Sequence, residues 1–330
     1  MKATAKAHSN IALIKYWGKR DERLNLPAVG SISLTLDALH TVTSVHFDSA
    51  LNDDELILND EKAGDKETAR ISAFLDLIRQ MAGMTHKARI NSQNNFPTAA
   101  GLASSASAFA ALALAAAKAA GLSLSRKELS VLARQGSGSA ARSVYGGLVE
   151  MKRGSAADGR DAYAVRLAEP DYWDLRLLIA VTSEAKKPVG STAGMRLSER
   201  TSPYYHAWVD NSENDLQDMR QAVQQKDFEK VGELCEFSAL KMHALALSSN
   251  PGLIYWNGAT VEGMHVVRSL RRTGLPVWFT IDAGPQLKAL CLPEAAAKVT
   301  EALQNVPGVR QVIECRTGPD ALVLNEEAPL

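Results

Sequence analysis

Hydrophobic and polar residues follow two different periodicities along the first half of the chain, which indicates a mixture of strands and helices. Residues 41–47 (TVTSVHF) alternate in the period-2 manner of a half-buried strand, and residues 56–58 (LIL) form a shorter strand candidate. An amphipathic helix is predicted where apolar side chains keep the i, i+3, i+4, i+7 spacing, at Ile71, Phe74, Leu75 and Ile78.

A second helix in this half carries signals at both ends. Residues 125–128 (SRKE) form a capping box, in which a serine and a glutamate satisfy free amides at a helix start. Leu129 and Leu132 follow on the predicted inward face. Residues 135–139 (QGSGS) end the helix, because glycine permits a tight reversal there, and their serines offer hydroxyl groups.

The second half continues the alternation of strands and helices. Residues 151–161 (MKRGSAADGRD) predict an exposed hairpin connection, and residues 175–182 (LRLLIAVT) predict a buried strand. Helical spacing recurs at Leu216, Met219 and Val223, and again at Phe228, Val231, Leu234 and Cys235. A helix at 261–270, closed by Gly274, precedes a strand at 277–281. Without internal repeats, this pattern predicts an α+β or α/β fold.

Length and charge narrow the class of protein. A chain of 330 residues exceeds what one hydrophobic core usually serves, so we expect two domains, residues 1–180 and 181–330. Apolar residues make up 46% of the chain, which is enough for sizeable cores. Lys and Arg number 37, as do Asp and Glu, so the formal net charge is zero. This balance gives no support for a nucleic-acid or membrane partner, and it leaves room for a local basic pocket.

Cysteine use and the N-terminal segment predict a cytoplasmic protein. The three cysteines, Cys235, Cys291 and Cys315, lack metal-ligand spacing, which fits buried free thiols in a reducing compartment. The N-terminal run MKATAKAHSNIALIKYWGK lacks the apolar core of a signal peptide. Lys118 interrupts the Ala-rich segment that comes nearest to the roughly 20 apolar residues of a membrane span.

The stretch that first indicates chemistry is a small-residue loop leading into an Ala-rich helix, residues 94–121 (NNFPTAAGLASSASAFAALALAAAKAAG). Gly101 lets the backbone approach a ligand, and Ser104 and Ser105 place hydroxyl groups where the first helix amides are unpaired. Those amides and the helix dipole form a ready anion site. Because the loop has neither a Walker A nor a G-x-G-x-x-G motif, its composition alone also fits a plainly capped, buried helix.

The order of the residues favours the anion site. The pattern P-x-x-x-G-L-x-S-S-A over residues 97–106 resembles the nucleotide motif of the GHMP kinase superfamily, whose loop and helix start wrap the ATP phosphates. The resemblance implies ATP and Mg²⁺, with Ser104 or Ser105 as a candidate magnesium ligand. It implies these nucleotide-binding residues: Asn91, Ser92, Asn94, Pro97, Ala99, Ala100, Gly101, Leu102, Ala103, Ser104 and Ser105. The three polar residues before the loop suit an ordinary polar connection almost as well.

Four further segments resemble the diphosphomevalonate decarboxylase family of this superfamily, in the family's order. They are residues 7–19 (AHSNIALIKYWGK), 136–143 (GSGSAARS), 186–195 (KKPVGSTAGM) and 279–285 (FTIDAGP). The resemblance therefore covers nearly the whole chain. It implies an α+β, two-domain GHMP kinase-like fold with the active site in the cleft between the domains, and a homodimer.

The family's substrate, mevalonate 5-diphosphate, carries a diphosphate, a C1 carboxylate and a tertiary C3 hydroxyl. ATP phosphorylates that hydroxyl, and loss of phosphate and CO₂ then leaves isopentenyl diphosphate. A polyanion of this kind needs several cations and hydroxyls to bind it. The family's substrate-binding positions are matched here by Tyr16, Lys19, Ser139, Arg142 and Ser191.

The resemblance implies that Asp282, Arg142 and Lys15 are catalytic. Asp282 would orient, and deprotonate, the C3 hydroxyl, although an ordinary pKa of about 4 makes positioning more important than proton transfer. Arg142 would hold the C1 carboxylate through two parallel hydrogen bonds. By residue type alone, Asp282 would instead be a turn residue and Arg142 half of a surface salt bridge.

Three alternatives to this function are a relative acting on mevalonate 5-phosphate, a mevalonate 3-kinase, and a non-catalytic nucleotide-binding protein. A 3-kinase would be expected to lose the partnership of Asp282 and Arg142, and a non-catalytic protein would lack Asp282 or the cations. The choice between mono- and diphosphate depends on pocket geometry. Gly190, where the family often has serine, removes one hydroxyl near the expected diphosphate, and Ala141 replaces a common cysteine.

Overall fold

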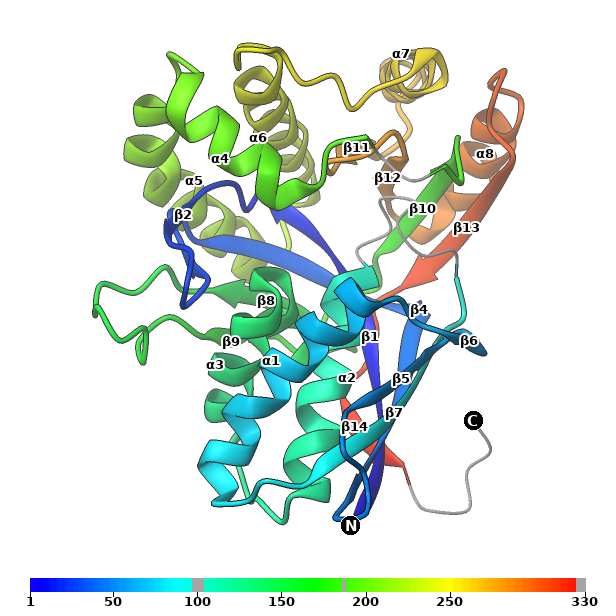
Figure 1. Ribbon diagram of the computed structural model, residues 1–330. Coiled ribbons are helices and arrows are strands. Elements are labelled where there is room, and N and C mark those ends of the chain that lie inside the picture. The colour runs from blue at the N-terminus through cyan, green and yellow to red at the C-terminus, as the bar shows by residue number, and fades with distance from the viewer. Residues whose placement is uncertain (97–103, 186–187, 325–330) are drawn as a thin grey trace.

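A computed structural model describes residues 1–96, 104–185 and 188–324, which form two β-sheets with helices packed on each (Figure 1). The first sheet has eight strands: β1 (Lys2–Ile14), β4 (Ser31–Asp48), β5 (Glu55–Leu58), β6 (Glu61–Lys62), β7 (Lys87–Asn94), β8 (Leu148–Met151), β9 (Ala164–Ala168) and β14 (Leu322–Leu324). Its main path runs β14-β1-β4-β7-β5-β6, and β8 pairs with β4 and β9. The pairing is antiparallel except between β5 and β7.

Three α-helices and one 3₁₀ helix accompany the first sheet: α1 (Asp65–Ala82), α2 (Ser104–Ala119), α3 (Arg126–Gly136) and η1 (Gly138–Val144). The predicted capping box opens α3, because the Ser125 hydroxyl accepts from the Glu128 amide and the Glu128 carboxylate accepts from the Ser125 amide. Helix α2 packs on β1 and β4, and its small side chains allow that close approach.

The second sheet has four antiparallel strands in the order β11-β12-β10-β13. They are β10 (Arg176–Val181), β11 (Val277–Ile281), β12 (Leu287–Cys291) and β13 (Gln311–Arg316). Its helices are α4 (Ser191–Thr201), α5 (Tyr205–Gln225), α6 (Phe228–Leu247), α7 (Gly258–Arg272) and α8 (Pro293–Gln304). A small hairpin of β2 (Lys19–Asp21) and β3 (Leu26–Pro27) stands apart from both sheets.

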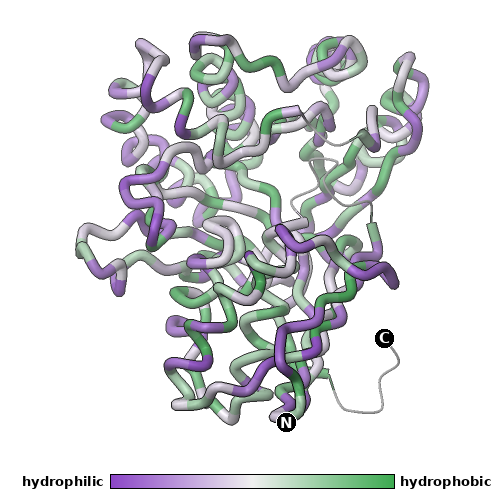
Figure 2. Tube along the Cα trace, viewed as in Figure 1, coloured by the Kyte–Doolittle hydropathy of each residue, from purple (hydrophilic) through white to green (hydrophobic). Residues whose placement is uncertain are grey.

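The two halves share a hydrophobic core. One cluster of buried side chains joins Leu13 and Leu34 of the first sheet to Leu177 of the second sheet and Met219 and Val231 of α5 and α6. Helix α6 packs on both β1 and β11, so it bridges the halves. Figure 2 shows hydrophobic residues concentrated along the inner strands and helices, and hydrophilic residues along the outer loops and helix faces. The ends of β1 and β11 are consequently held beside one another.

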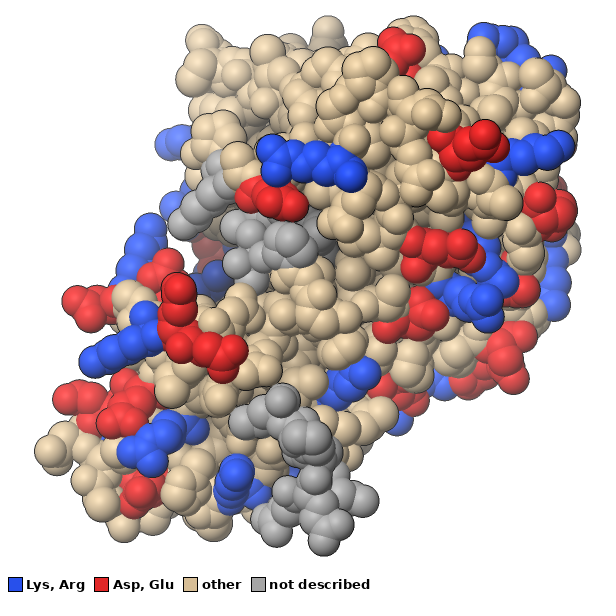
Figure 3. Space-filling model, turned by 90° about the vertical axis from the view of Figure 1, so that its right-hand side faces the viewer, with Lys and Arg blue, Asp and Glu red and all other residues tan. Residues whose placement is uncertain are grey.

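The predicted α+β fold and the helices and strands inferred from periodicity are confirmed, including the hairpin connection between β8 and β9. The division after residue 180 stays a prediction; strand β10, which ends at Val181, pairs only within the second sheet, whereas β14 returns to the first. No helix among the described residues is long and apolar enough to cross a membrane. Basic and acidic side chains are interspersed on the face in Figure 3, in keeping with the balanced composition.

Candidate active site

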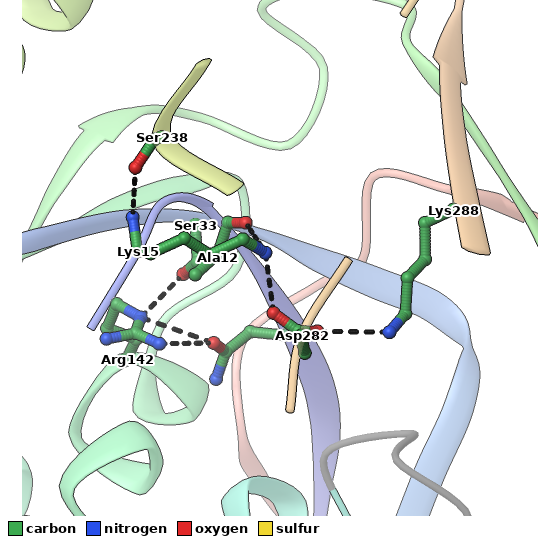
Figure 4. Close-up of polar contacts among 8 residues, drawn as sticks. Ala12, Lys15, Ser33, Arg142, Ser238, Asp282 and Lys288 are labelled. Atoms are coloured by element: carbon green, nitrogen blue, oxygen red, sulfur yellow. Dashed lines mark hydrogen bonds and ion pairs between the residues drawn. The ribbon is translucent and has the colours of Figure 1, made fainter. Parts of the chain in front are cut away.

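Asp282 directly follows β11 and lies at the centre of a cluster of charged side chains (Figure 4). Its Oδ1 accepts from Lys15 Nζ at 2.6 Å, and its Oδ2 lies 3.2 Å from Lys288 Nζ. Its side chain is 25% exposed, so it is accessible from one side. Burial by itself would raise the pKa of Asp282, but the two ammonium groups outweigh it and hold that pKa far below its usual range. The carboxylate is therefore ionised and fixed.

Lys15 comes to Asp282 from the other half of the molecule, one residue after the end of β1. Its side chain is 1% exposed, and its Nζ also donates to the Ala12 carbonyl at 2.7 Å. The Lys15 amide donates to the Ser238 hydroxyl of α6 at 2.9 Å, which fixes the backbone where β1 ends. The contact between Lys15 and Asp282 thus joins the two sheets at the site.

Arg142, on η1, is a buried charge of the site, and the residue is 2% exposed. Its guanidinium donates to Asn10 Oδ1 at 3.1 and 3.2 Å and to Ser33 Oγ at 2.9 Å, and it also donates to the Ser31 hydroxyl. Burial lowers the pKa of Arg142 to about 10, so it remains charged at neutral pH. These hydrogen-bond partners are neutral, and no carboxylate among the described residues forms an ion pair with Arg142; Asp282 acts on its charge from a greater distance.

Tyr16 lies against the 3₁₀ helix that carries Arg142, and Ser139 is part of that helix. The Tyr16 hydroxyl is buried and makes no hydrogen bond within the described residues, and burial raises the pKa of Tyr16. A Cβ atom at Gly138 would lie 2.6 Å from Tyr16 Oη, so only glycine allows η1 to approach that ring. Asn10 Nδ2 donates to the Ser139 carbonyl at 3.0 Å and to Ser143 Oγ at 2.7 Å, which ties η1 to β1.

Lys19 reaches the start of α4, whose first residue is Ser191. Lys19 Nζ lies 3.4 Å from Thr192 Oγ1, and Ser191 is the first residue of that helix. Burial lowers the pKa of Lys19, and Glu22 partly opposes this. The α4 N-cap, Gly190, provides no side-chain cap, so a ligand anion could accept from the helix amides beside Lys19.

The described part of the predicted nucleotide site consists of β7 and the start of α2; residues 97–103, which hold the rest of the motif, lie outside the described residues. Ser105 Oγ lies 3.2 Å from Ser137 Oγ, which in turn lies 3.3 Å from Ser139 Oγ. Three hydroxyls thus connect the α2 start to η1. Ser104, the first residue of α2, is half-buried.

The polar residues on β7 have contacts within the sheet. Ser92 Oγ lies 2.8 Å from Thr43 Oγ1, and Asn94 Oδ1 accepts from Thr41 Oγ1 at 2.6 Å. The Asn91 side-chain oxygen is buried and has no hydrogen-bond partner within the described residues. These contacts account for Ser92 and Asn94 structurally, and their predicted roles toward the nucleotide stay predictions.

Sequence reasoning missed Lys288, Ser31 and Ser33. Lys288 is a lone cation within the apolar run of β12, and that interruption of the pattern is a signal that could have identified it. Ser31 and Ser33 alternate along β4 and point the same way, but hydroxyls in a strand carry no special signal. Arg70 of α1 was also missed; it donates to the Gly136 carbonyl at 2.8 Å and adds a cation near Lys19.

Together, these side chains can bind a polyanion and place an ionised carboxylate beside a substrate hydroxyl. No group of three or more His, Cys, Asp or Glu residues is placed to hold a metal ion in the described ranges. Magnesium usually keeps several waters and is held largely through substrate phosphates, so this arrangement fits a metal that enters with a nucleotide.

Two family models match the chain in succession. The diphosphomevalonate decarboxylase-like N-terminal domain matches residues 7–164, and the mevalonate 5-diphosphate decarboxylase C-terminal domain matches residues 177–325. The diphosphomevalonate decarboxylase of Candida albicans is 39% identical over 298 residues, covering 86% of this chain and 82% of that protein.

Solved structures agree with these matches. The mevalonate diphosphate decarboxylase of Staphylococcus aureus superimposes with a TM-score of 0.93 at 41% identity, covering 98% of both chains. A protein called MDDEF, solved in complex with MVAPP, AMPPCP and magnesium, gives a TM-score of 0.92 at 40% identity and covers 98% of this chain and 99% of its own.

Proposed function

This chain belongs to the diphosphomevalonate decarboxylase family, and we propose that it converts mevalonate 5-diphosphate and ATP to isopentenyl diphosphate, ADP, phosphate and CO₂. The observation that carries the proposal is the presence in one site of a fixed carboxylate, Asp282, and a buried cation, Arg142, whose hydrogen-bond partners are neutral. In the proposed mechanism, the carboxylate aligns the C3 hydroxyl for phosphorylation, and the cation holds the substrate carboxylate that leaves as CO₂.

Asp282 orients the C3 hydroxyl for attack on the γ-phosphate. Each carboxylate oxygen has two acceptor positions, so contact with one lysine leaves each oxygen able to accept from the hydroxyl. Because its pKa is held well below the usual range, Asp282 is a weak base. Its contribution is therefore chiefly to hold the hydroxyl in line for phosphoryl transfer, where positioning dominates.

Arg142 holds the C1 carboxylate and sets up cleavage of the C1–C2 bond. Its neutral partners fix the plane of the guanidinium, and its charge remains available for an anion. As phosphate departs from C3, positive charge develops there, the C1–C2 electron pair moves toward C3, and C1 leaves as CO₂. The nearby anions stabilise that developing charge.

The remaining cations and hydroxyls suit the diphosphate. Ser191 begins α4 and Lys19 contacts its second residue, whereas Ser139 shares η1 with Arg142 and Tyr16 lies against Gly138 of that helix. The roles of Lys15 and of these four residues are supported by family motif and by placement. Lys15 is already engaged by Asp282, so we assign it to positioning the carboxylate and to neutralising charge near the transferred phosphoryl group.

ATP and magnesium complete the reaction. The start of α2, with Ser104 and Ser105, would receive the phosphates, and either hydroxyl could join the magnesium coordination sphere. Magnesium bound there would neutralise charge on the transferred phosphoryl group. We also expect a homodimer and a cytoplasmic location on family grounds.

A substrate panel tests the proposal. The purified chain is incubated with ATP, Mg²⁺ and, in turn, mevalonate, its 5-phosphate and its 5-diphosphate, while ADP and CO₂ are followed. We expect equal amounts of ADP and CO₂ from the diphosphate. CO₂ mainly from the 5-phosphate would change the assigned substrate, and ADP without CO₂ would indicate a 3-kinase. No product from any of the three compounds would contradict the proposed enzymatic function.

A further inference from the structure

Lys288 is a buried cation that the proposed reaction does not use directly. It lies in the middle of β12 with a side chain that is 0% exposed, opposite Thr280 of β11 and Ile179 of β10. A buried ammonium is expensive to desolvate, so an aliphatic residue would suit the folding of this sheet better. The presence of lysine there therefore calls for a functional reason.

The direction of the side chain supplies one. Neighbouring residues of a strand point to opposite faces, so Lys288 shares its face with Leu290, which belongs to the core cluster that joins the two halves. On this face its Nζ lies 3.2 Å from Asp282 Oδ2 (Figure 4). Lys288 consequently reaches the Asp282 carboxylate from the neighbouring strand of the same sheet.

The two lysines around Asp282 differ in where they are anchored. Lys15 belongs to the end of β1 in the first half, and it contacts Oδ1 across the junction. Lys288 and Asp282 belong to adjoining strands of one sheet, so their separation does not depend on how the two halves sit. Lys288 is also sealed from solvent, whereas Asp282 is partly open. Lys15 is nearly as buried as Lys288, so the two lysines differ in the half of the molecule that anchors them and not in their access to solvent.

That difference matters because the proposed substrates are polyanions. A diphosphate, a carboxylate and the ATP phosphates all raise the pKa of a neighbouring carboxyl group, since like charges favour its protonated form. A protonated Asp282 could no longer accept from the C3 hydroxyl in the required way. A counter-charge that the ligands cannot draw away is therefore needed at Asp282.

The other titratable groups near Asp282 cannot supply this positive counter-charge. Among the described residues, those coupled to it electrostatically besides the two lysines are Arg142 of η1 and His243 and Cys235 of α6. Burial, with Lys15 adding to it, lowers the pKa of His243 to about 3, and burial raises that of Cys235 to about 11. Both are neutral at pH 7, and Arg142 faces the substrate carboxylate.

We propose that Lys288 is a positioning residue that holds the Asp282 carboxylate in place and keeps it negatively charged while the anionic substrates are bound. The proposal rests on the proposed function, because it assumes polyanionic substrates at Asp282. It assigns Lys288 no contact with substrate or nucleotide.

The test compares pH profiles of kcat for Lys288→Met, Lys288→Arg and the wild type. In Lys288→Met we expect the acid limb to move to higher pH by about 1 unit, because one opposite charge near a carboxylate lowers its pKa by that order. KM for ATP and for mevalonate 5-diphosphate should stay within about twofold, because Lys288 touches neither. Phosphate ionisations of the substrates are common to all variants, so they cancel in the comparison.

Thr280→Val is the matched control, because it alters the cross-strand neighbour of Lys288 without altering charge. Its acid limb should coincide with that of the wild type. An unmoved limb in Lys288→Met, or a rise in KM that accounts for the whole defect, would overturn the proposal. If Lys288→Met does not fold, the neutral variant Lys288→Gln takes its place: an acid limb moved to higher pH supports the proposal, and an unmoved limb contradicts it. A wild type that releases no CO₂ would instead reject the proposed function.

Discussion

Arg142 in the first half is a buried charge and Asp282 in the second is a partly exposed one, and their surroundings are built in opposite ways. Arg142 is held by an amide and two hydroxyls, so its charge is positioned but not neutralised. Asp282 is held by two ammonium groups, so its charge is both positioned and neutralised. The neutral setting prepares a cation to receive an anion, and the charged setting keeps a carboxylate ionised when anions arrive. In the proposed mechanism, hydrogen bonds hold the Arg142 cation that binds a substrate anion, and ion pairs hold the Asp282 carboxylate that must stay ionised.

The largest effect is expected from Asp282→Asn, which keeps the shape of the side chain and removes its charge. Turnover should fall by about 1000-fold or more, in the upper range for loss of an acid–base group, because the hydroxyl is no longer aligned. Nucleotide binding, measured by titration calorimetry, should change little. Asp158→Asn on an exposed loop is the control and should retain full activity. Near-normal turnover in Asp282→Asn would remove Asp282 from its assigned role.

Arg142→Met should produce the next largest effect. Removing the guanidinium leaves the C1 carboxylate without its cation, and kcat/KM for mevalonate 5-diphosphate should fall by about 100-fold, the scale of one lost electrostatic stabiliser. Arg89→Met, at an exposed ion pair with Glu55, is the control. A variant with unchanged kcat/KM would show that another group holds the carboxylate.

Asn10→Asp gives Arg142 a charged partner in place of a neutral one, because it puts a carboxylate next to the guanidinium. The guanidinium would then be neutralised as Asp282 is, and KM for mevalonate 5-diphosphate should rise by about tenfold, equivalent to about 1.4 kcal/mol of binding. The same change on the surface, Asn211→Asp of α5, is the control. If KM is unchanged, the neutral partners of Arg142 have no importance for binding.

The smallest effect concerns stability at low pH. The pKa of Asp282 is depressed in the folded state, so this carboxylate stabilises the fold above its ordinary pKa, and that contribution is lost as pH falls below it. Arg142, with a pKa lowered by burial to about 10, stays charged throughout acid conditions. Urea unfolding at a series of acidic pH values should therefore show a shallower pH slope for Asp282→Asn than for the wild type, and an unchanged slope for Arg142→Met. Parallel slopes for all three proteins would contradict this assignment.

Local features of the fold could be predicted from sequence, and features that depend on distant partners could not. The Ser125–Glu128 capping box and the spacing of Phe74 and Ile78 predicted α3 and α1, because their signals lie within a few residues. The return of β14 to pair with β1 could not be predicted, since residues at opposite ends of the chain form that ladder and neither strand is distinctive alone.

The site divides in the same way. Asp282 and Arg142 were identified because each lies in a motif of successive residues, and the order of that motif carries information. Lys288 was missed although it lies only six residues after Asp282, because its importance arises from a strand pairing across the sheet. Ser33 was missed for a related reason: its hydroxyl is ordinary in a strand and gains meaning only from the approach of η1.

The division of labour between the two charges is the central claim, and a single-turnover experiment tests it directly. Mevalonate 5-diphosphate labelled at C1 is mixed with excess enzyme and labelled ATP. The reaction is quenched at successive times, and the ADP and CO₂ formed are measured. We predict that Asp282→Asn forms neither product, whereas Arg142→Met forms ADP measurably faster than it releases CO₂. ADP formation by Asp282→Asn, or ADP and CO₂ that remain strictly coupled in Arg142→Met, would contradict the account.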